Sequence, residues 1–527
     1  MANAMRGPAA WVGLLIGLAA AWPVVLQDPR QISSLFTDDT FYYLQVARHA
    51  ARGEGFTFDG INPTNGFQPL WQLVLVGFAW LFPADTELLR AVVLLQAGLL
   101  GAAGMVLCRI LEPRAGPVGT TTAAVALLGL PGSSLLLLGM EAALFLLILL
   151  LAWHAWLLCE EKGDIQVSDA ARLGLLCGML FLARVEGALA TPVAAVLASR
   201  MLRRRGRTAM RLIPLLLPPA LIAGLYLCWN QCAFGTLLPV SGRVKLHWLS
   251  FLPGTRRLLA LVDIPWVGRH LLASAWGTHL PPPAARLLSG VLLAGVTLVA
   301  AARPGAHRGF VAVTGLPFLL WTCGAIVLFD QVALAPFMGE WATVPVHLLT
   351  ALALAFLAWR VPRMGRAALS ILVLACVLRV PVQVKQAVHW QDSFVGRGIL
   401  MASWMDRRVP PGDRIGAPYA GVIGIFSHRT VVNLDRLVNS PDFYSRVVRG
   451  GMWDAWVASQ NLRWIADIGC RGEPPLMGVT SRARQKFALA SCYRVNHQIA
   501  LPDLRPQCGL ILWESDSGRC PAPAGGA

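Results

Sequence analysis

Charged residues are scarce in this chain, whereas long apolar stretches are abundant. Only 14% of its 527 residues are Asp, Glu, Lys or Arg, 56% are hydrophobic, and the mean hydropathy is +0.58. A soluble protein could not bury so much apolar surface, so the composition excludes that class and indicates a polytopic α-helical membrane protein. Acidic residues are also few, 28 against 45 basic ones. Almost half of the basic residues lie in short clusters between apolar stretches, where they orient spans toward the cytoplasm, so the charge does not indicate nucleic-acid binding.

Two other signals are absent. The glycines at 416, 421 and 424 lack the G-x-G-x-x-G spacing, so they do not form a dinucleotide-binding fingerprint. We also find no pair of related halves, which a secondary transporter would be expected to show. A membrane transporter or flippase of lipid-linked saccharides stays an alternative function, as does a non-catalytic envelope-assembly protein.

The first apolar stretch, Trp11 to Gln27, is predicted to be an uncleaved span with a cytoplasmic N-terminus. A secretory signal peptide is the alternative, because Arg6, an apolar run and three alanines at 19–21 imitate its parts. The apolar run continues to Leu26 and an acidic loop follows directly, which favours the span.

The acidic pair Asp38 and Asp39 follows this span by about ten residues and should lie just outside the membrane. Residues after it repeat apolar side chains at three- and four-residue spacing, which predicts a short amphipathic helix on the bilayer surface. One interpretation of the pair is N-terminal capping of that helix. The other is a general base with a partner acid at the mouth of a membrane-embedded cavity.

The pattern D-D-x-F-Y-Y followed by T-F-D-G-x-N-P-T-N-G-F-x-P-L-W resembles the first extracytoplasmic loop of the GT-C superfamily of polyprenyl-phosphate-sugar-dependent glycosyltransferases. That superfamily includes protein O-mannosyltransferases, aminoarabinose transferases and arabinofuranosyltransferases. Three further segments are similar to segments of bacterial members of this superfamily: G-M-E-A-A-L, L-A-R-V-E-G and F-G-T-L-L-P-V-S-G-R-V-K. The segment N-L-D-R-L-V-N shows a looser resemblance. The resemblance implies a GT-C-like fold and an enzyme that transfers a hexosyl or pentosyl group with inversion.

A membrane domain over residues 1–384 is predicted to hold about eleven spans. Its first outer loop covers 28–87 and its second 230–283, and the apolar stretch Pro69 to Phe82 is too short to cross as a helix and is interpreted as re-entrant or interfacial. The apolar stretch Leu173 to Ser199 lies between two basic clusters, so it should form a hairpin with its apex near Arg184. The remaining predicted spans are Leu88 to Leu107, Val118 to Leu135, Ala142 to Leu158, Leu212 to Trp229, Ala284 to Ala302, Phe310 to Phe329, Thr343 to Trp359 and Ala367 to Val382.

Residues 385–527 lack long apolar runs and are predicted to form a soluble α/β domain on the outer face. The segments V-P-P-G-D-R-I-G-A-P-Y-A-G-V-I-G-I-F and T-V-V-N-L-D are predicted to form two short strands around a Gly-rich turn, and R-W-I-A-D-I-G is a third strand candidate. Four cysteines fall there, Cys470, Cys492, Cys508 and Cys520, in a compartment that should be oxidising, so one or two disulfides are expected. No C-x-x-C pair occurs among them, which disfavours zinc.

Sugar transfer from a lipid phosphate needs a carboxylate that accepts the acceptor's proton and cations that hold the departing phosphate. Asp38 and Asp39 are the catalytic candidates, and Asp38 is preferred from the resemblance to protein O-mannosyltransferases. Arg184, Arg243 and Lys245 are the phosphate-binding candidates, with pairing of Arg184 to Glu186 or Glu141, and solvation or snorkelling of the other two, as alternatives. Further candidates for substrate binding are Tyr42, Tyr43, Asp59, Asn65, Gln68, Glu141, Glu186 and Ser241.

Several of these residues have a simpler interpretation. Asp59, Asn62, Asn65 and Gln68 are favoured as turn formers, while Glu340 and His347 are ambiguous. Some relatives in the superfamily bind a divalent cation at the acidic pair and others work without one, so a metal cofactor is left open. The expected partners are a polyprenyl-phosphate-linked sugar donor, membrane lipids and an envelope glycan, lipid or protein acceptor, in the inner membrane of the cell envelope.

Overall fold

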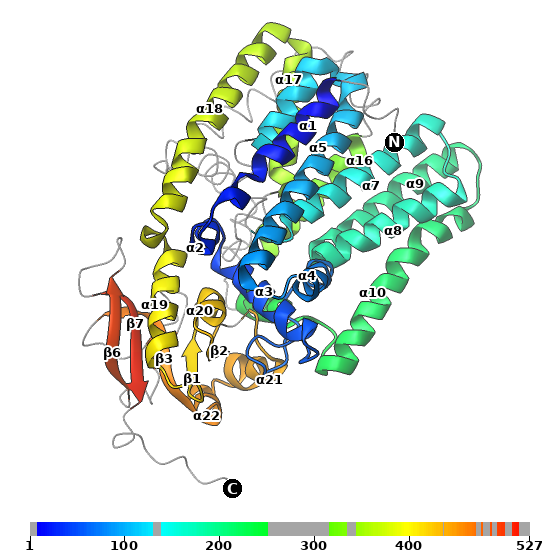
Figure 1. The fold of residues 1–527 in the computed structure, drawn as a ribbon. Coiled ribbons are helices and arrows are strands. Elements are labelled where there is room, and N and C mark those ends of the chain that lie inside the picture. Colours follow the sequence, from blue (N-terminus) through cyan, green and yellow to red (C-terminus); the bar gives the residue numbers. More distant parts are fainter. Residues whose placement is uncertain are drawn as a thin grey trace.

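The computed structural model describes residues 8–129, 139–250, 316–334, 344–435, 437–470, 476–477, 485–486, 493–500 and 508–515. Figure 1 shows a bundle of long helices joined to a smaller domain that contains a sheet, with α3 and α4 between the two. The predicted span Ala284 to Ala302, most of the second outer loop, Glu340, Cys492 and Cys520 lie outside the described residues.

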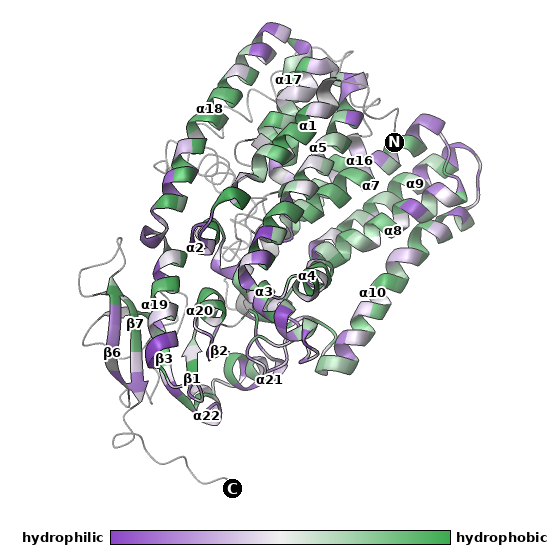
Figure 2. Cartoon of the chain, in the orientation of Figure 1, coloured by the Kyte–Doolittle hydropathy of each residue, from purple (hydrophilic) through white to green (hydrophobic). Residues whose placement is uncertain are grey.

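The bundle is built from helices of very different lengths. They are α1 Pro8–Ala20, η2 Trp22–Val25, α2 Pro29–Ser33, α3 Asp38–Ala51, α4 Pro69–Leu81, α5 Asp85–Ala124, η3 Val125–Gly129, α7 Ala142–Lys162, α8 Val167–Ala183, η4 Val185–Leu189, α9 Ala190–Arg204, η5 Ala209–Leu212, α10 Ile213–Phe234, α11 Val240–Ser250, α16 Leu316–Leu334, α17 Val344–Arg360 and α18 Pro362–Val388. In Figure 2 the long helices are mostly hydrophobic, and hydrophilic residues gather at helix ends and in the smaller domain.

Five helical segments in the described part of the chain are long and apolar enough to span a membrane: Asp85–Gly129, Ala142–Lys162, Val185–Arg204, Ala209–Phe234 and Pro362–Val388. The first contains two helical arms, because Gly116 has φ 65° and interrupts the helix between Pro113 and Pro117. This break agrees with the predicted turn between two separate spans. The membrane protein class is therefore confirmed, whereas the total of about eleven spans stays a prediction.

The predicted hairpin between the two basic clusters is present. Helix α8 ends at Ala183, the short helix η4 forms the apex, and α9 returns from Ala190. The apex residue Arg184 pairs with Glu141, which also accepts a hydrogen bond from Tyr43 of α3. The apex thus lies at the α3 end of the bundle, as the topology requires. Which side of a membrane this end faces stays a prediction.

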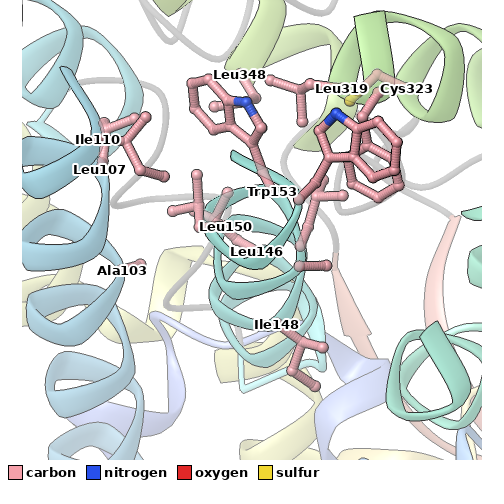
Figure 3. Packing of buried hydrophobic residues seen from close by; sticks show 14 of the residues in the cluster. Ala103, Leu107, Ile110, Leu146, Ile148, Leu150, Trp153, Leu319, Cys323 and Leu348 are labelled. Carbon is pink, nitrogen blue, oxygen red and sulfur yellow. The ribbon is translucent and has the colours of Figure 1, made fainter. Parts of the chain in front are cut away.

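Helix α7 forms the centre of the bundle. Figure 3 shows its Leu146, Leu150 and Trp153 packed between side chains of α5, α16 and α17. Trp153 is fully buried, so it contributes to the bundle through close van der Waals packing.

Small residues let α1 pack closely on α5. A Cβ atom at Gly13 would lie 2.6 Å from the backbone carbonyl carbon of Gly104, and one at Gly17 would lie 2.8 Å from Cα of Gly101. Such backbone approach is typical of helix pairs in membranes, where van der Waals packing drives association.

The smaller domain has the predicted α/β character. Its sheet has the strand order β2-β1-β3-β7-β6, in which β1 (Arg414–Ala417) pairs in parallel with β2 (Thr430–Asn433) and with β3 (Leu462–Cys470). All three lie in the segments that the sequence predicts as strands, but the end of the first segment, A-G-V-I-G-I-F, forms the helix α20 (Ala420–Phe426) instead. Strands β6 (Tyr493–Ala500) and β7 (Cys508–Ser515) add an antiparallel edge, and β4 (Leu476–Met477) pairs with β5 (Gln485–Lys486).

Short helices complete the smaller domain: η8 Trp390–Asp392, α19 Phe394–Arg408, α20 Ala420–Phe426, α21 Pro441–Phe443, η9 Tyr444–Arg449 and α22 Trp453–Ser459. Helix α18 runs through to Val388, past the predicted boundary at Lys385, so the membrane bundle and the smaller domain are joined by a continuous helix. In the sheet, Cys470 is opposite Cys508 in register. The one or two disulfides that the sequence predicts stay a prediction.

Candidate active site at the junction of bundle and smaller domain

The acidic pair occupies the first turn of α3, where the helix meets the smaller domain. Oδ1 of Asp38 accepts a hydrogen bond from the backbone N–H of Val422, at 2.8 Å, in the first turn of α20. Thr37 is in the N-cap position and makes no side-chain capping bond. In the described residues Asp38 thus contacts a distant segment of the chain, which is more than the capping interpretation requires.

Tyr42, one helical turn after Asp38, strengthens the same contact. Its hydroxyl donates to the carbonyl of Pro418 and accepts from the N–H of Ala420, both at 2.9 Å. We predicted Tyr42 as a candidate for substrate binding, but its hydroxyl is buried and joins α3 to the turn between β1 and α20. Its ring packs on Phe58, with ring centroids 5.1 Å apart.

Both acidic residues have a strongly raised pKa. Burial raises the pKa of Asp38 to about 7, the charge of Asp39 adds to this, and the N–H of Val422 opposes it. Burial likewise raises the pKa of Asp39 to about 7, with further increases from Asp435 and Glu141 and a decrease from Lys245. A carboxyl that titrates near neutrality is suited to take up and release a proton at working pH.

Arg184 lies in a closed group of buried charges. Its guanidinium pairs with Glu141 at 3.1 Å and with Glu186 at short range, and the three residues are 6%, 1% and 5% exposed. The hydroxyl of Tyr43 donates to Glu141 at 3.4 Å and accepts from the backbone N–H of Gln68 at 3.1 Å. Two carboxylates thus compensate Arg184, as the structural alternative in the sequence analysis proposes.

The cations of α11 have a different environment. Arg243 places its guanidinium 4.1 Å from the centre of the Tyr444 ring, and its Nη1 is buried without a hydrogen-bond partner in the described residues. Lys245 is half-buried, and its charge lowers the pKa of both Asp39 and Glu141. Ser241 is half-buried on the same helix. Unlike Arg184, Arg243 therefore has donor capacity that is not used by a carboxylate.

The N-P-T-N-G segment of the first loop has two structural tasks. Asp59 accepts from the backbone N–H groups of Ile61 and Asn62, at 2.9 and 2.7 Å, which confirms the predicted turn. Asn65 is different, because its amide donates to Asn230 of α10 and accepts from the N–H of Val240, both at 3.0 Å. The preference for a turn was therefore wrong for Asn65, which ties the first loop to α10 and α11.

The sequence analysis missed two contributions to this junction. Asp435 follows β2 and raises the pKa of Asp39. It lies in the N-L-D-R-L-V-N segment, so the looser resemblance was a usable signal. Val422 acts through its backbone N–H, which leaves no trace in side-chain chemistry. No sequence pattern could have identified it.

The described residues offer no evident set of ligands for a metal ion. No group of three or more His, Cys, Asp or Glu side chains is arranged to hold a metal ion in the part of the chain that the structure describes. The acidic pair alone does not make such a set, and we derive no chemical step through a metal.

An apolar cavity of about 370 Å³ lies next to the junction, between α4, α8 and α10. Its lining is rich in aromatic and branched side chains: Phe56, Phe67, Pro69, Leu73, Leu182, Ile222, Leu225, Tyr226 and Trp229. This lining suits a hydrocarbon segment of a ligand.

No family model matches the sequence. No curated protein matches it either. Among solved structures, the fold is similar to ArnT from Cupriavidus metallidurans bound to undecaprenyl phosphate, with a TM-score of 0.56, 13% identity, and coverage of 98% of this chain and 100% of that one. The archaeal oligosaccharyltransferase AglB from Archaeoglobus fulgidus, in complex with an inhibitory peptide and a dolichol-phosphate, has a TM-score of 0.47 and 15% identity, over 87% of this chain and 69% of that one. The chain therefore has a fold similar to that of ArnT over nearly its whole length.

Proposed function

We propose that this protein transfers a sugar from a polyprenyl-phosphate carrier to a hydroxyl group of an envelope glycan, lipid or protein at the outer face of the inner membrane. The observation that carries the proposal is the acidic pair of α3. Both carboxyls lie at the junction with a pKa of about 7, and the charge of Lys245 acts on Asp39. The fold similarity to ArnT, which was solved with undecaprenyl phosphate, supports a lipid-phosphate ligand.

The reaction is a single displacement. The acceptor hydroxyl gives its proton to a carboxylate oxygen of Asp38, and its oxygen forms a bond to the anomeric carbon of the sugar. The bond between that carbon and the phosphate oxygen breaks, so polyprenyl phosphate leaves with the electron pair. Attack from the face opposite the leaving group inverts the anomeric centre. Asp39 tunes the pKa of Asp38 through its negative charge.

Negative charge develops on the departing phosphate in the transition state. A cation placed beside the phosphate therefore stabilises the transition state more than the ground state. Arg243 and Lys245 on α11 can supply this positive charge, because the Nη1 of Arg243 has no hydrogen-bond partner in the described residues and Lys245 is half-buried. A guanidinium suits two contacts to one phosphate, and an ammonium acts as a compact charge. We assign Arg184 a supporting role instead, since Glu141 and Glu186 already compensate it.

The apolar cavity beside the junction gives the carrier a place for its hydrocarbon chain. At about 370 Å³ it accommodates only a few isoprene units, so the rest of the carrier would lie along the outside of α4 and α10. Several side chains on these helices, including Leu73, Leu221 and Leu225, are exposed and apolar, as a lipid-facing surface requires.

The experiment compares lipid-linked sugars and envelope glycans, by mass spectrometry, from cells that express the wild-type protein, Asp38→Asn or Asp39→Asn. Loss of transfer should make a polyprenyl-phosphate sugar accumulate and remove one sugar mass from a glycan, which also identifies donor and acceptor. Asp442→Asn is the matched control, because Asp442 is an exposed residue of the smaller domain whose one ion pair among the described residues is with Arg446, at 3.5 Å. Unchanged lipids and glycans in both acidic variants would contradict the proposal.

A further inference from the structure

The turn formed by residues 418–422, which comprises the link after β1 and the start of α20, contacts α3 at two points on one helical face. The N–H of Val422 binds Oδ1 of Asp38, and one turn later the hydroxyl of Tyr42 bridges Ala420 N–H and the carbonyl of Pro418. Residues four apart lie on the same side of a helix. The turn therefore fixes both the position of α3 and the orientation of the Asp38 carboxylate.

Gly421 makes this approach feasible. A Cβ atom at that position would lie 2.3 Å from the carbonyl oxygen of Asp38 and 2.9 Å from its Oδ1. Both distances are shorter than van der Waals contact allows, and the first involves backbone that cannot rotate away. Any side chain at 421 must therefore push the turn away from the carboxylate.

The Asp38 carboxylate is held from the side of the smaller domain. Its Oδ1 receives the Val422 N–H at 2.8 Å, and the backbone N–H of Gly421 also lowers the pKa of this carboxyl. A carboxylate held through one oxygen presents the other in a defined direction. A proton acceptor gains from such a fixed direction, since a misplacement of about 1 Å can cost roughly 10²-fold in rate.

We infer that the smaller domain is part of the active site: Gly421 admits the turn, and the N–H of Val422 aims the Asp38 carboxylate at the acceptor hydroxyl. This inference rests on the proposed function. Gly421 and Val422 are positioning residues, since they act through Asp38. The bundle would thus carry the base, and the smaller domain would set its direction.

The contact itself can be tested without any substrate. Hydrogen exchange of the Val422 amide is measured by mass spectrometry in the full-length protein in lipid nanodiscs, for the wild type and for Asp38→Ala. Loss of a hydrogen bond to a charged acceptor should speed exchange at Val422 by about tenfold or more. Asp442→Ala, remote from the turn, should leave it unchanged. Equal exchange in the wild type and Asp38→Ala would overturn the inference.

The positioning role is tested by Gly421→Ala with Gly412→Ala as matched control, because a Cβ at Gly412 meets no atom within 4 Å. With the polyprenyl-phosphate sugar purified from the accumulating cells as donor, Gly421→Ala should lower kcat about 10²-fold and leave the KM for donor within about twofold. Losing the Val422 N–H also removes an interaction that favours the ionised carboxylate of Asp38, beside Asp39. The acidic limb of the kcat/KM profile should therefore move to higher pH.

Tyr42→Phe provides a second variant if Gly421→Ala does not fold. It removes the hydroxyl that holds the turn and should lower kcat in the same direction by a smaller factor. A wild-type kcat and pH profile in a folded Gly421→Ala would overturn the positioning role alone. Absence of transfer by the wild-type protein would overturn the proposed function, and the exchange of Val422 would still report on the contact.

Discussion

Two groups of charged residues lie at the junction, and their charges are balanced in different ways. The first group, Glu141, Arg184 and Glu186, is closed, since every member is at most 6% exposed and each carboxylate pairs with the guanidinium. The second group contains Asp38 and Asp39 from α3 and Lys245 from α11. Its members influence one another through their fields, and both carboxyls have a pKa near 7.

The difference shows why a charge near a membrane domain is an incomplete signal of function. A buried ion pair is costly to break but contributes little net stability, so the closed group indicates a specific arrangement of helices. It fixes the apex of the α8–α9 hairpin to the turn before α7. The open group retains protonation states that can change, which is what proton transfer requires. Removing members of the two groups should therefore affect different properties.

The largest effect is expected in the open group. Asp38→Asn should lower the rate of sugar transfer by about 10²- to 10⁴-fold, because an amide cannot accept the acceptor's proton. Asp39→Asn should cost less, since Asp39 acts through charge. Steady-state kinetics of the purified variants would measure both, with thermal unfolding as the control for folding. Equal wild-type rates in the two variants would return the acidic pair to a structural role.

Substitutions in the closed group should change the stability of the protein. Arg184→Gln removes the cation that pairs directly with two buried carboxylates and should destabilise the protein by about 3 to 5 kcal/mol. The triple variant Glu141→Gln, Arg184→Gln, Glu186→Gln should recover part of that loss, because no charge is left buried. Unfolding midpoints in nanodiscs would show the pattern. A stable Arg184→Gln with weak donor binding would instead assign Arg184 to the phosphate.

Lys245→Ala should affect turnover and donor binding together. A lost charge-assisted contact to phosphate costs roughly 10- to 100-fold in kcat/KM, and part of the loss should be in the KM for donor. Lys245→Arg should retain more activity than Lys245→Ala. The measurement is initial rate against donor concentration. A change confined to the KM for acceptor would contradict the assignment of Lys245 to the donor.

The last prediction concerns pH. The raised pKa values of Asp38 and Asp39 should make both the transfer rate and the stability depend on pH. Below about pH 7 the rate should fall about tenfold per pH unit as the base becomes protonated.

Stability should change with pH in the opposite direction to the rate. Because both folded pKa values are raised above 3.8, each carboxyl contributes stability that is present below pH 3.8 and is lost as pH rises through about 7. Unfolding midpoints from pH 5 to 8 should fall in the wild type and change less in the double amide variant.

The sequence predicted those parts of the molecule in which local pattern decides structure. The apolar stretch between two basic clusters predicted the α8–α9 hairpin, and short strand patterns located β2, β3 and the segment that contains both β1 and α20. Strands β6 and β7 were missed, because they pair with each other and with β3 through long-range register. Charge and hydropathy carry no information about such pairing.

The candidate site was predictable to the level of residue types. Asp38 and Asp39 could be chosen because adjacent carboxylates beside a membrane are costly, and Lys245 because of its place in an outer loop. The sequence could not distinguish Arg184 from Arg243, since both are arginines near apolar segments. Their difference lies in the surroundings: carboxylates from two elements compensate one, and the other lies over the Tyr444 ring.

The hydrogen bond from Val422 to Asp38 also affects the order of events during synthesis. Its two residues are 384 positions apart in the chain, so the base is made early and the group that orients it is made late. At about 5 to 20 residues per second, roughly 20 to 80 seconds separate the two. A nascent chain would have most of its described helices in the membrane before its carboxylate is aimed. The proposed sugar transfer would therefore require the chain to be made at least as far as Val422.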